Sequence, residues 1–187
     1  KRIRLTGGEP LARRGAVDVA RDIGQLLGKG LEELTLTTNA SRLREHAAGL
    51  RDAGIARINV SLDTRDPDRF RHITRTGDLA RVLDGITAAK EAGLGIKINM
   101  VALRGLNDRE FAPMLEWCAD QGFDLSLIET MPLGMIEEDR TDRFLPLTQV
   151  QEELASRFTL IPSTYRTGGP ARYWQVQELG THIGFIS

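Results

Sequence analysis

The stretch "RLTGGEPLARR" (residues 4–14) decides how the fold is interpreted. A short strand-like run (1–5), in which Ile3 and Leu5 alternate with basic residues, ends on Gly7-Gly8-Glu9-Pro10, which predicts a strand that stops at a tight turn. Two glycines in that place either turn the chain or leave the backbone bare for a ligand, because glycine has no side chain. The second alternative raises the question of what has to come so close to the end of a strand.

Working outward, four further apolar, β-branched runs alternate with segments of helical periodicity, each closed by a glycine. The strands are expected at 33–38, 57–62, 95–103 and 124–130, and the helices at 16–28, 41–54, 78–93 and 107–122. This alternation predicts right-handed βαβ units with a parallel sheet. Because a closed eight-stranded barrel takes about 250 residues, we expect a partial barrel or an open doubly wound sheet.

The last forty or so positions follow a different pattern. A helix is expected at 148–158, and the rest alternates and turns at Gly168-Gly169-Pro170 and at Leu179-Gly180, which predicts two antiparallel strands. We therefore divide the chain into an α/β core (1–146) and a C-terminal helix with antiparallel strands (147–187).

Composition excludes several classes of partner. The chain has 25 basic and 26 acidic side chains, and its formal net charge of -1 gives no sign of a nucleic-acid surface or a membrane patch. No apolar run approaches the roughly 18 residues of a spanning helix. Cys118 is the single cysteine, so a disulfide within the chain is excluded, and we expect a buried thiol and a cytoplasmic protein.

Polar residues gather where the strands end, which is where parallel α/β folds bind ligands. They are Thr6–Glu9, 37–39, 61–63 and 129–131, with Lys97 and Asn99 inside the fourth strand, two apart and hence on one face. Helix capping for Thr38 and Asp63, and a water-facing edge for Lys97, remain open as alternatives. Three scattered histidines indicate no metal site, and no nucleophile–base–acid set is found. Polar side chains gathered at one end of a sheet suit the binding of a charged cofactor beside a charged substrate.

The motifs "RLTGGEPL", "LTTNA", "INVSLD", "KINMV" and "IETMPLG", in this order, resemble the radical S-adenosylmethionine (radical SAM) enzymes. Within these they are most similar to the GTP 3′,8-cyclase family of molybdenum cofactor (molybdopterin) biosynthesis. The resemblance implies a partial (β/α)6 barrel. It also implies a lyase that uses a 5′-deoxyadenosyl radical from S-adenosylmethionine to turn GTP into (8S)-3′,8-cyclo-7,8-dihydroguanosine 5′-triphosphate.

The resemblance also assigns binding residues, and none that is catalytic or holds a metal. The contacts implied for S-adenosylmethionine are Gly8, Ser61 and Met131, and those implied for GTP are Arg4, Thr37 and Lys97. A forked guanidinium and a compact ammonium suit a triphosphate. The glycine backbone suits the amino end of S-adenosylmethionine, with the charge of Glu9 nearby.

The chain departs from the family in its cysteines. Family members hold two [4Fe–4S] clusters, on an N-terminal CxxxCxxC loop and on a C-terminal cysteine set, and one cysteine cannot replace either set. We expect a chain that is truncated at both ends and is inactive alone. The resemblance also makes a homodimer possible for the intact protein. Two alternatives stay open: a radical SAM peptide-maturation enzyme, and a non-catalytic nucleotide-binding remnant.

Overall fold

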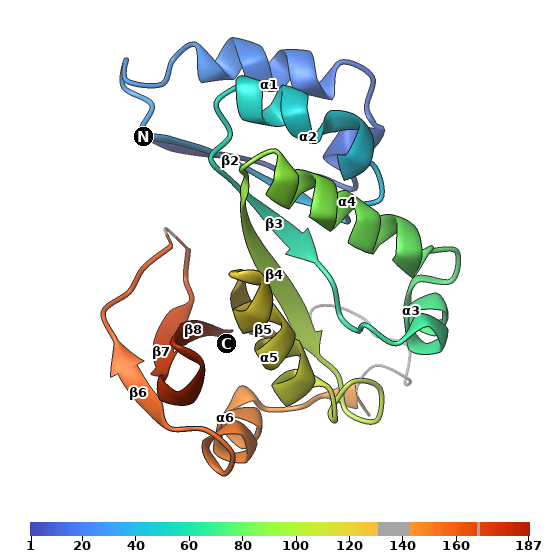
Figure 1. Cartoon of the computed structure of the whole chain (residues 1–187), viewed down its shortest axis with the longest axis vertical. Helices are drawn as coiled ribbons and strands as arrows, with labels where there is room; N and C mark the ends of the chain where they lie inside the picture. The colour runs from blue at the N-terminus through green and yellow to red at the C-terminus, as the bar shows by residue number, and fades with distance from the viewer. Residues whose placement is uncertain (131–142, 168) are drawn as a thin grey trace. The chain divides into compact units, whose positions relative to one another are not determined.

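The computed structural model describes residues 1–130, 143–167 and 169–187 (Figure 1). These form two compact units, Lys1–Ser61 with Phe70–Lys97, and Leu62–Arg69 with Ile98–Ser187. The chain passes between the units three times: directly after Ser61, within α3 (Pro67–Thr74) and within β4 (Gly95–Ala102). The division at 146 expected from the sequence stays a prediction.

The first unit is built on three parallel strands in the order β1-β2-β3. They are β1 (Arg2–Leu5), β2 (Glu33–Thr38) and β3 (Arg57–Ser61). In each, alternate residues are apolar: Leu36 of β2 and Ile58 of β3 are register partners, and both are buried. The other face carries the polar residues, as a period of two requires.

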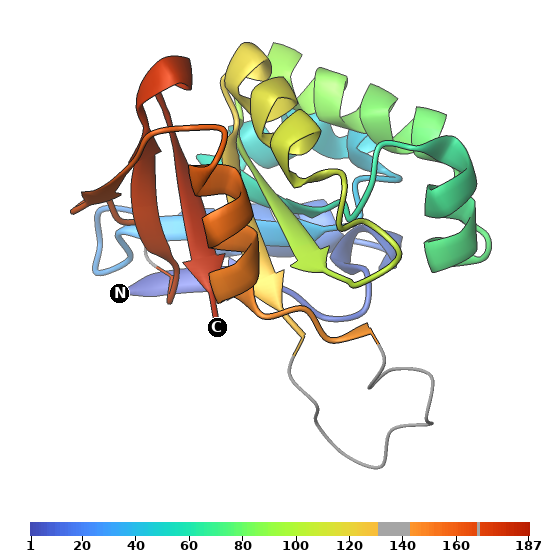
Figure 2. The same ribbon diagram turned by 90° about the horizontal axis from the view of Figure 1, so that it is seen from below.

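Three helices, α1 (Ala16–Gly24), α2 (Leu43–Asp52) and α4 (Leu79–Glu91), lie on the apolar face of these strands (Figures 1 and 2). Helix α4 comes close to the end of β2 because Gly85 lacks a side chain; a methyl group there would collide with the Ala40 carbonyl oxygen. Ala40 itself is fully buried and adopts a left-handed backbone with φ 64°. Because these three helices all lie on the apolar face, they leave the opposite, polar face of the strands uncovered within this unit.

The second unit holds the strand order β5-β8-β7-β6. Strand β5 (Asp124–Glu129) pairs in parallel with β8 (Thr181–Ile186), which pairs antiparallel with β7 (Arg172–Val176), and β7 pairs antiparallel with β6 (Leu160–Ser163). Two helices, α5 (Phe111–Gln121) and α6 (Leu147–Ala155), belong to this unit, as do a short 3-10 helix (Gln177–Leu179) and the core side chains Leu115, Leu127 and Phe185.

The expected elements are confirmed, with differences at their ends. Strand 33–38 matches β2, and the antiparallel C-terminal strands are present, with β6 as a third that was not expected. Asp78 caps α4 by accepting from the backbone N–H groups of Ala80 and Arg81. Ser41 does not cap α2, because its hydroxyl donates to Asn39 Oδ1. None of the helices in the described residues is long and apolar enough to cross a bilayer.

Candidate functional site: the polar face of β1–β3

The polar face of the first unit consists of side chains from three adjacent strands. Parallel register places Arg4 beside Thr35, Thr35 beside Arg57, and Thr37 beside Asn59. Ser61 follows two residues after Asn59 and points to the same side. We call Arg4, Thr35, Thr37, Asn59 and Ser61 the polar face.

Three of the six residues assigned from the sequence lie on this face: Arg4, Thr37 and Ser61. Arg4 and Ser61 are exposed and Thr37 is half-buried. Lys97 lies in β4 and is 3% exposed. Gly8 lies in the turn after β1, and Met131 falls outside the described residues.

The backbone of the turn after β1 is sterically accessible at Gly7 and Gly8. Gly7 has φ 152°, and a Cβ built on either Gly7 or Gly8 would meet no atom of the described residues within 4 Å. A ligand can therefore approach this backbone as closely as hydrogen bonding requires. The turn meets the steric requirement for binding the amino end of S-adenosylmethionine.

Glu9 holds this turn to the end of β2. Its Oε1 accepts from the Leu11 N–H at 3.0 Å and from the Thr38 hydroxyl at 2.8 Å, and its Oε2 accepts from the Asn39 N–H at 2.7 Å. Thr38 Oγ1 in turn accepts from the Ala40 N–H at 3.1 Å. The negative charge of Glu9 is thus stabilised by the chain's own donors, a structural role that the motif alone did not reveal.

Asn59, in the middle of the polar face, was not singled out from the sequence. It is 1% exposed, and its Nδ2 donates to Thr37 Oγ1 over 3.4 Å. Its Oδ1 is buried, with no hydrogen-bond partner among the described residues. Asn99 Oδ1, in the second unit, is also buried without a hydrogen-bond partner among the described residues. For both residues, the sequence signal of a buried polar group is an asparagine in the middle of a strand.

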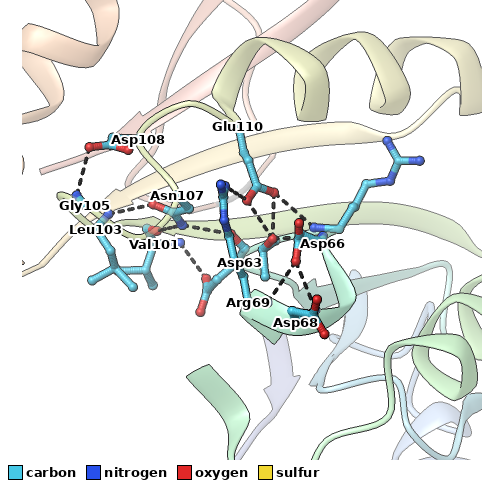
Figure 3. Close-up of polar contacts among 12 residues, drawn as sticks. Asp63, Asp66, Asp68, Arg69, Val101, Leu103, Gly105, Asn107, Asp108 and Glu110 are labelled. Atoms are coloured by element: carbon cyan, nitrogen blue, oxygen red, sulfur yellow. Dashed lines mark hydrogen bonds and ion pairs between the residues drawn. The ribbon is translucent and has the colours of Figure 1, made fainter. Parts of the chain in front are cut away.

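A second polar network, also missed by the sequence analysis, lies in the second unit just after β3 (Figure 3). Asp63 accepts from the Val101 N–H at 2.8 Å, so it is not a helix cap. Asn107, fully buried, donates from Nδ2 to the carbonyls of Asp63 and Val101 and accepts from the Leu103 N–H. Helix α5 begins at Phe111, later than expected. Burial raises the pKa of the Asp63 carboxyl.

Glu110 extends the network towards α3. It accepts from the Thr64 hydroxyl and forms an ion pair with Arg69, whose Nη1 lies 2.6 Å from Glu110 Oε1. Asp66 caps α3 by accepting from the N–H groups of Asp68 and Arg69. The pair Asp66-Pro67 is the sequence signal that predicts such a helix start. These contacts fix the segment that follows Ser61.

The described residues do not supply ligands for an iron–sulfur cluster. No group of three His, Cys, Asp or Glu side chains in them is placed to hold a metal ion. Cys118 is fully buried, and burial raises the pKa of its thiol to about 12. A thiol in this state lacks the thiolate character that metal ligation needs.

Comparison with protein families gives two matches. The radical SAM superfamily model matches residues 1–118, and the model described as Molybdenum Cofactor Synthesis C matches residues 123–187. Together they cover almost the whole chain, and the first alone covers more than half of it.

Curated relatives match the chain along its whole length. A GTP 3′,8-cyclase of Rhizobium etli is 55% identical over 186 residues, covering 100% of this chain and 53% of the relative. A GTP 3′,8-cyclase of Erythrobacter litoralis is 56% identical, covering 100% of this chain and 56% of the relative. The chain spans about half the length of the curated relatives it matches.

Solved structures with low sequence identity share the fold. Streptococcus suis SuiB bound to S-adenosylmethionine has a TM-score of 0.60 at 16% identity, over 83% of this chain and 36% of that one. Coproporphyrinogen III oxidase (HemN) from Escherichia coli, described as a radical SAM enzyme, has a TM-score of 0.58 at 19% identity, over 83% and 39%. The expected α/β fold of radical SAM type is confirmed. With a family model matched over residues 1–118, the chain belongs to the radical SAM superfamily.

Proposed function

We propose that this chain forms the nucleotide-binding core of a GTP 3′,8-cyclase, the lyase that produces (8S)-3′,8-cyclo-7,8-dihydroguanosine 5′-triphosphate early in molybdenum cofactor biosynthesis. The observation that carries the proposal is the match of the entire chain, at 55% identity, to relatives of that name. The C-terminal match to Molybdenum Cofactor Synthesis C supports the same conclusion independently.

In this proposal the bare turn at Gly8 receives the amino end of S-adenosylmethionine through backbone groups, and Ser61 donates a hydroxyl hydrogen bond to its polar end. When bound there, S-adenosylmethionine would supply a 5′-deoxyadenosyl radical for removal of the ribose 3′-hydrogen of GTP, after one electron from an iron–sulfur cluster of the intact protein breaks its sulfur–C5′ bond and releases methionine. Met131 is retained as a proposed contact to the adenosine part, although it lies outside the described residues. The open space at Gly7 and Gly8 supports this placement.

GTP is bound by Arg4, Thr37 and Lys97. The triphosphate carries several negative charges, which a guanidinium and an ammonium neutralise by charge-assisted hydrogen bonds. Arg4 and Thr37 share one face of adjacent strands, which supports binding of a single extended nucleotide across β1 and β2.

Four finer points come with the proposal. The intact protein holds two [4Fe–4S] clusters on cysteines that the described residues do not include, it is cytoplasmic, and it forms a homodimer. Residues 147–187 act as the extension that leads to the second cluster. Iron analysis and sedimentation of the gene product that carries this chain test the cluster and dimer statements directly.

The central test measures binding and turnover in that gene product, purified without oxygen. Lys97→Ala and Arg4→Ala are each expected to weaken GTP binding by about tenfold or more, because a charge-assisted hydrogen bond is lost. Lys90→Ala, which removes an exposed cation on α4, serves as the matched control. Dissociation constants for GTP and for S-adenosylmethionine are measured separately, together with formation of the cyclised nucleotide.

Weaker GTP binding with intact S-adenosylmethionine binding supports the proposal. An unchanged apparent GTP KM in Lys97→Ala contradicts it and favours a peptide-maturation enzyme, since a peptide has no triphosphate to neutralise. GTP binding without cyclised product and without cluster iron favours the non-catalytic remnant.

A further inference from the structure

We propose that Asn59 accepts a hydrogen bond from a ribose hydroxyl of GTP and so selects a ribonucleotide over its deoxy forms. The inference rests on the proposed function and adds a specificity-determining residue to it. Asn59 lies within the motif "INVSLD", but it is not one of the six binding residues that the resemblance assigns.

The first support is the buried, unpartnered oxygen. Asn59 is 1% exposed, and its Oδ1 has no partner among the described residues. A buried amide oxygen left unpaired costs free energy comparable to a lost hydrogen bond. Native proteins retain such groups where a ligand, ion or water completes them.

The second support is the contact that the amide makes with Thr37. Because Nδ2 donates to Thr37 Oγ1, the oxygen of the amide is the group left for a partner, and an amide oxygen only accepts. The partner is therefore a donor. The same contact occupies a lone pair of Thr37, so its hydroxyl hydrogen is free to donate to a ligand oxygen. Asn59 and Thr37 thus present one acceptor and one donor side by side.

The third support is the position of this pair along the strands. Arg4 is the register partner of Thr35, two residues before Thr37, and Ser61 lies two residues after Asn59. Each two-residue step advances roughly 6.6 Å along a strand. The pair therefore lies between the level of the cation proposed for the triphosphate and the level of the residue proposed for S-adenosylmethionine.

The ribose is the part of GTP that joins the triphosphate to the base, and it must face the adenosyl group for its hydrogen to be removed. It also carries the hydroxyl donors of the nucleotide. A ribose at the level of Thr37 and Asn59 meets both conditions, and its hydroxyl completes Asn59 Oδ1.

The experiment compares GTP, 2′-deoxy-GTP and 3′-deoxy-GTP as ligands of the cluster-containing gene product. Binding is measured by equilibrium dialysis, so the readout does not depend on turnover. Wild type is expected to bind GTP about threefold to tenfold more tightly than one of the two deoxy analogues, the usual effect of one neutral hydrogen bond. In Asn59→Ala this preference is expected to fall to about twofold or less, with S-adenosylmethionine binding unchanged.

Two further variants keep the test decisive. Asn59→Asp retains an acceptor of the same shape, so it should keep the preference for nucleotides that carry the hydroxyl. It should bind every triphosphate more weakly, because its carboxylate repels the phosphate charges. If Asn59→Ala does not fold, Asn59→Asp still tests whether the acceptor selects the hydroxyl. Thr87→Ala is the control, because Thr87 lies on the exposed face of α4, away from the polar face, and its hydroxyl donates to the Leu83 carbonyl at 3.0 Å. It should keep the full preference.

The inference is overturned if wild type binds the three nucleotides equally, or if Asn59→Ala retains the wild-type preference. In both cases GTP binding by wild type would still stand, and the proposed function with it. Failure of wild type to bind GTP at all would overturn the proposed function and this inference together.

Discussion

Removing the Glu9 carboxylate should loosen the turn that carries Gly7 and Gly8. In Glu9→Ala, three donors lose their acceptor: the N–H groups of Leu11 and Asn39 and the hydroxyl of Thr38, at 3.0, 2.7 and 2.8 Å. At about 1 kcal/mol for each hydrogen bond, with a discount for the exposed one to Asn39, the expected loss of unfolding free energy is about 2–3 kcal/mol.

Glu9→Gln separates the three bonds. An amide oxygen at the position of Oε1 still accepts from Leu11 and Thr38, whereas the amide nitrogen at the position of Oε2 faces the Asn39 N–H, donor against donor. We expect a loss of about 1 kcal/mol, smaller than in Glu9→Ala and localised at Asn39.

Urea unfolding gives the free energies, and amide hydrogen exchange gives the location. Exchange at Asn39 should accelerate in both variants, and exchange at Leu11 only in Glu9→Ala. Glu32→Ala is the control, because its carboxylate is 71% exposed and pairs only with exposed cations, so the loss should stay below about 0.5 kcal/mol. Equal losses in Glu9→Gln and Glu9→Ala would refute this assignment of the three bonds.

Three further predictions follow from the packing. Gly85→Ala should lower the unfolding free energy by about 1–3 kcal/mol despite its better helix propensity, because the methyl group meets the Ala40 carbonyl; Thr87→Ala on the exposed face of α4 is the control, and equal stability of the two variants would contradict the close approach. Cys118, whose thiol pKa burial raises to about 12, should resist iodoacetamide at about pH 8 until urea is added, as mass spectrometry can show; alkylation of the folded protein would count against this. Burial raises the pKa of Asp63, so ionisation is less favourable in the folded state than in the unfolded one. The advantage of the neutral carboxyl is complete below the usual pKa of about 3.9 and is lost as pH rises through the folded pKa. Urea titrations across this range should show Asp63→Asn abolishing that fall, and an identical pH profile in both proteins would refute the assignment.

Much of the fold was predictable because it depends on local pattern. The alternation in 33–38 and 57–62 places Leu36 and Ile58 on one face and Thr37 and Asn59 on the other, whatever surrounds them. Asp78 caps its helix by contacts within three residues. The start of helix α3 at Asp66-Pro67 was missed because the helix is only 8 residues long and rich in charged side chains.

The candidate site likewise has features that the sequence predicts and features that it does not. The sequence by itself determined which side chains stand at the strand ends, and the radical SAM family to which they belong, since motif and period are properties of neighbouring residues. Only the tertiary structure decided that Glu9 reaches Thr38 across 29 positions, that Asn107 reaches Asp63 across 44, and that Asn59 keeps an unpaired oxygen. Such partners depend on strand register and on how loops return, which no local periodicity encodes.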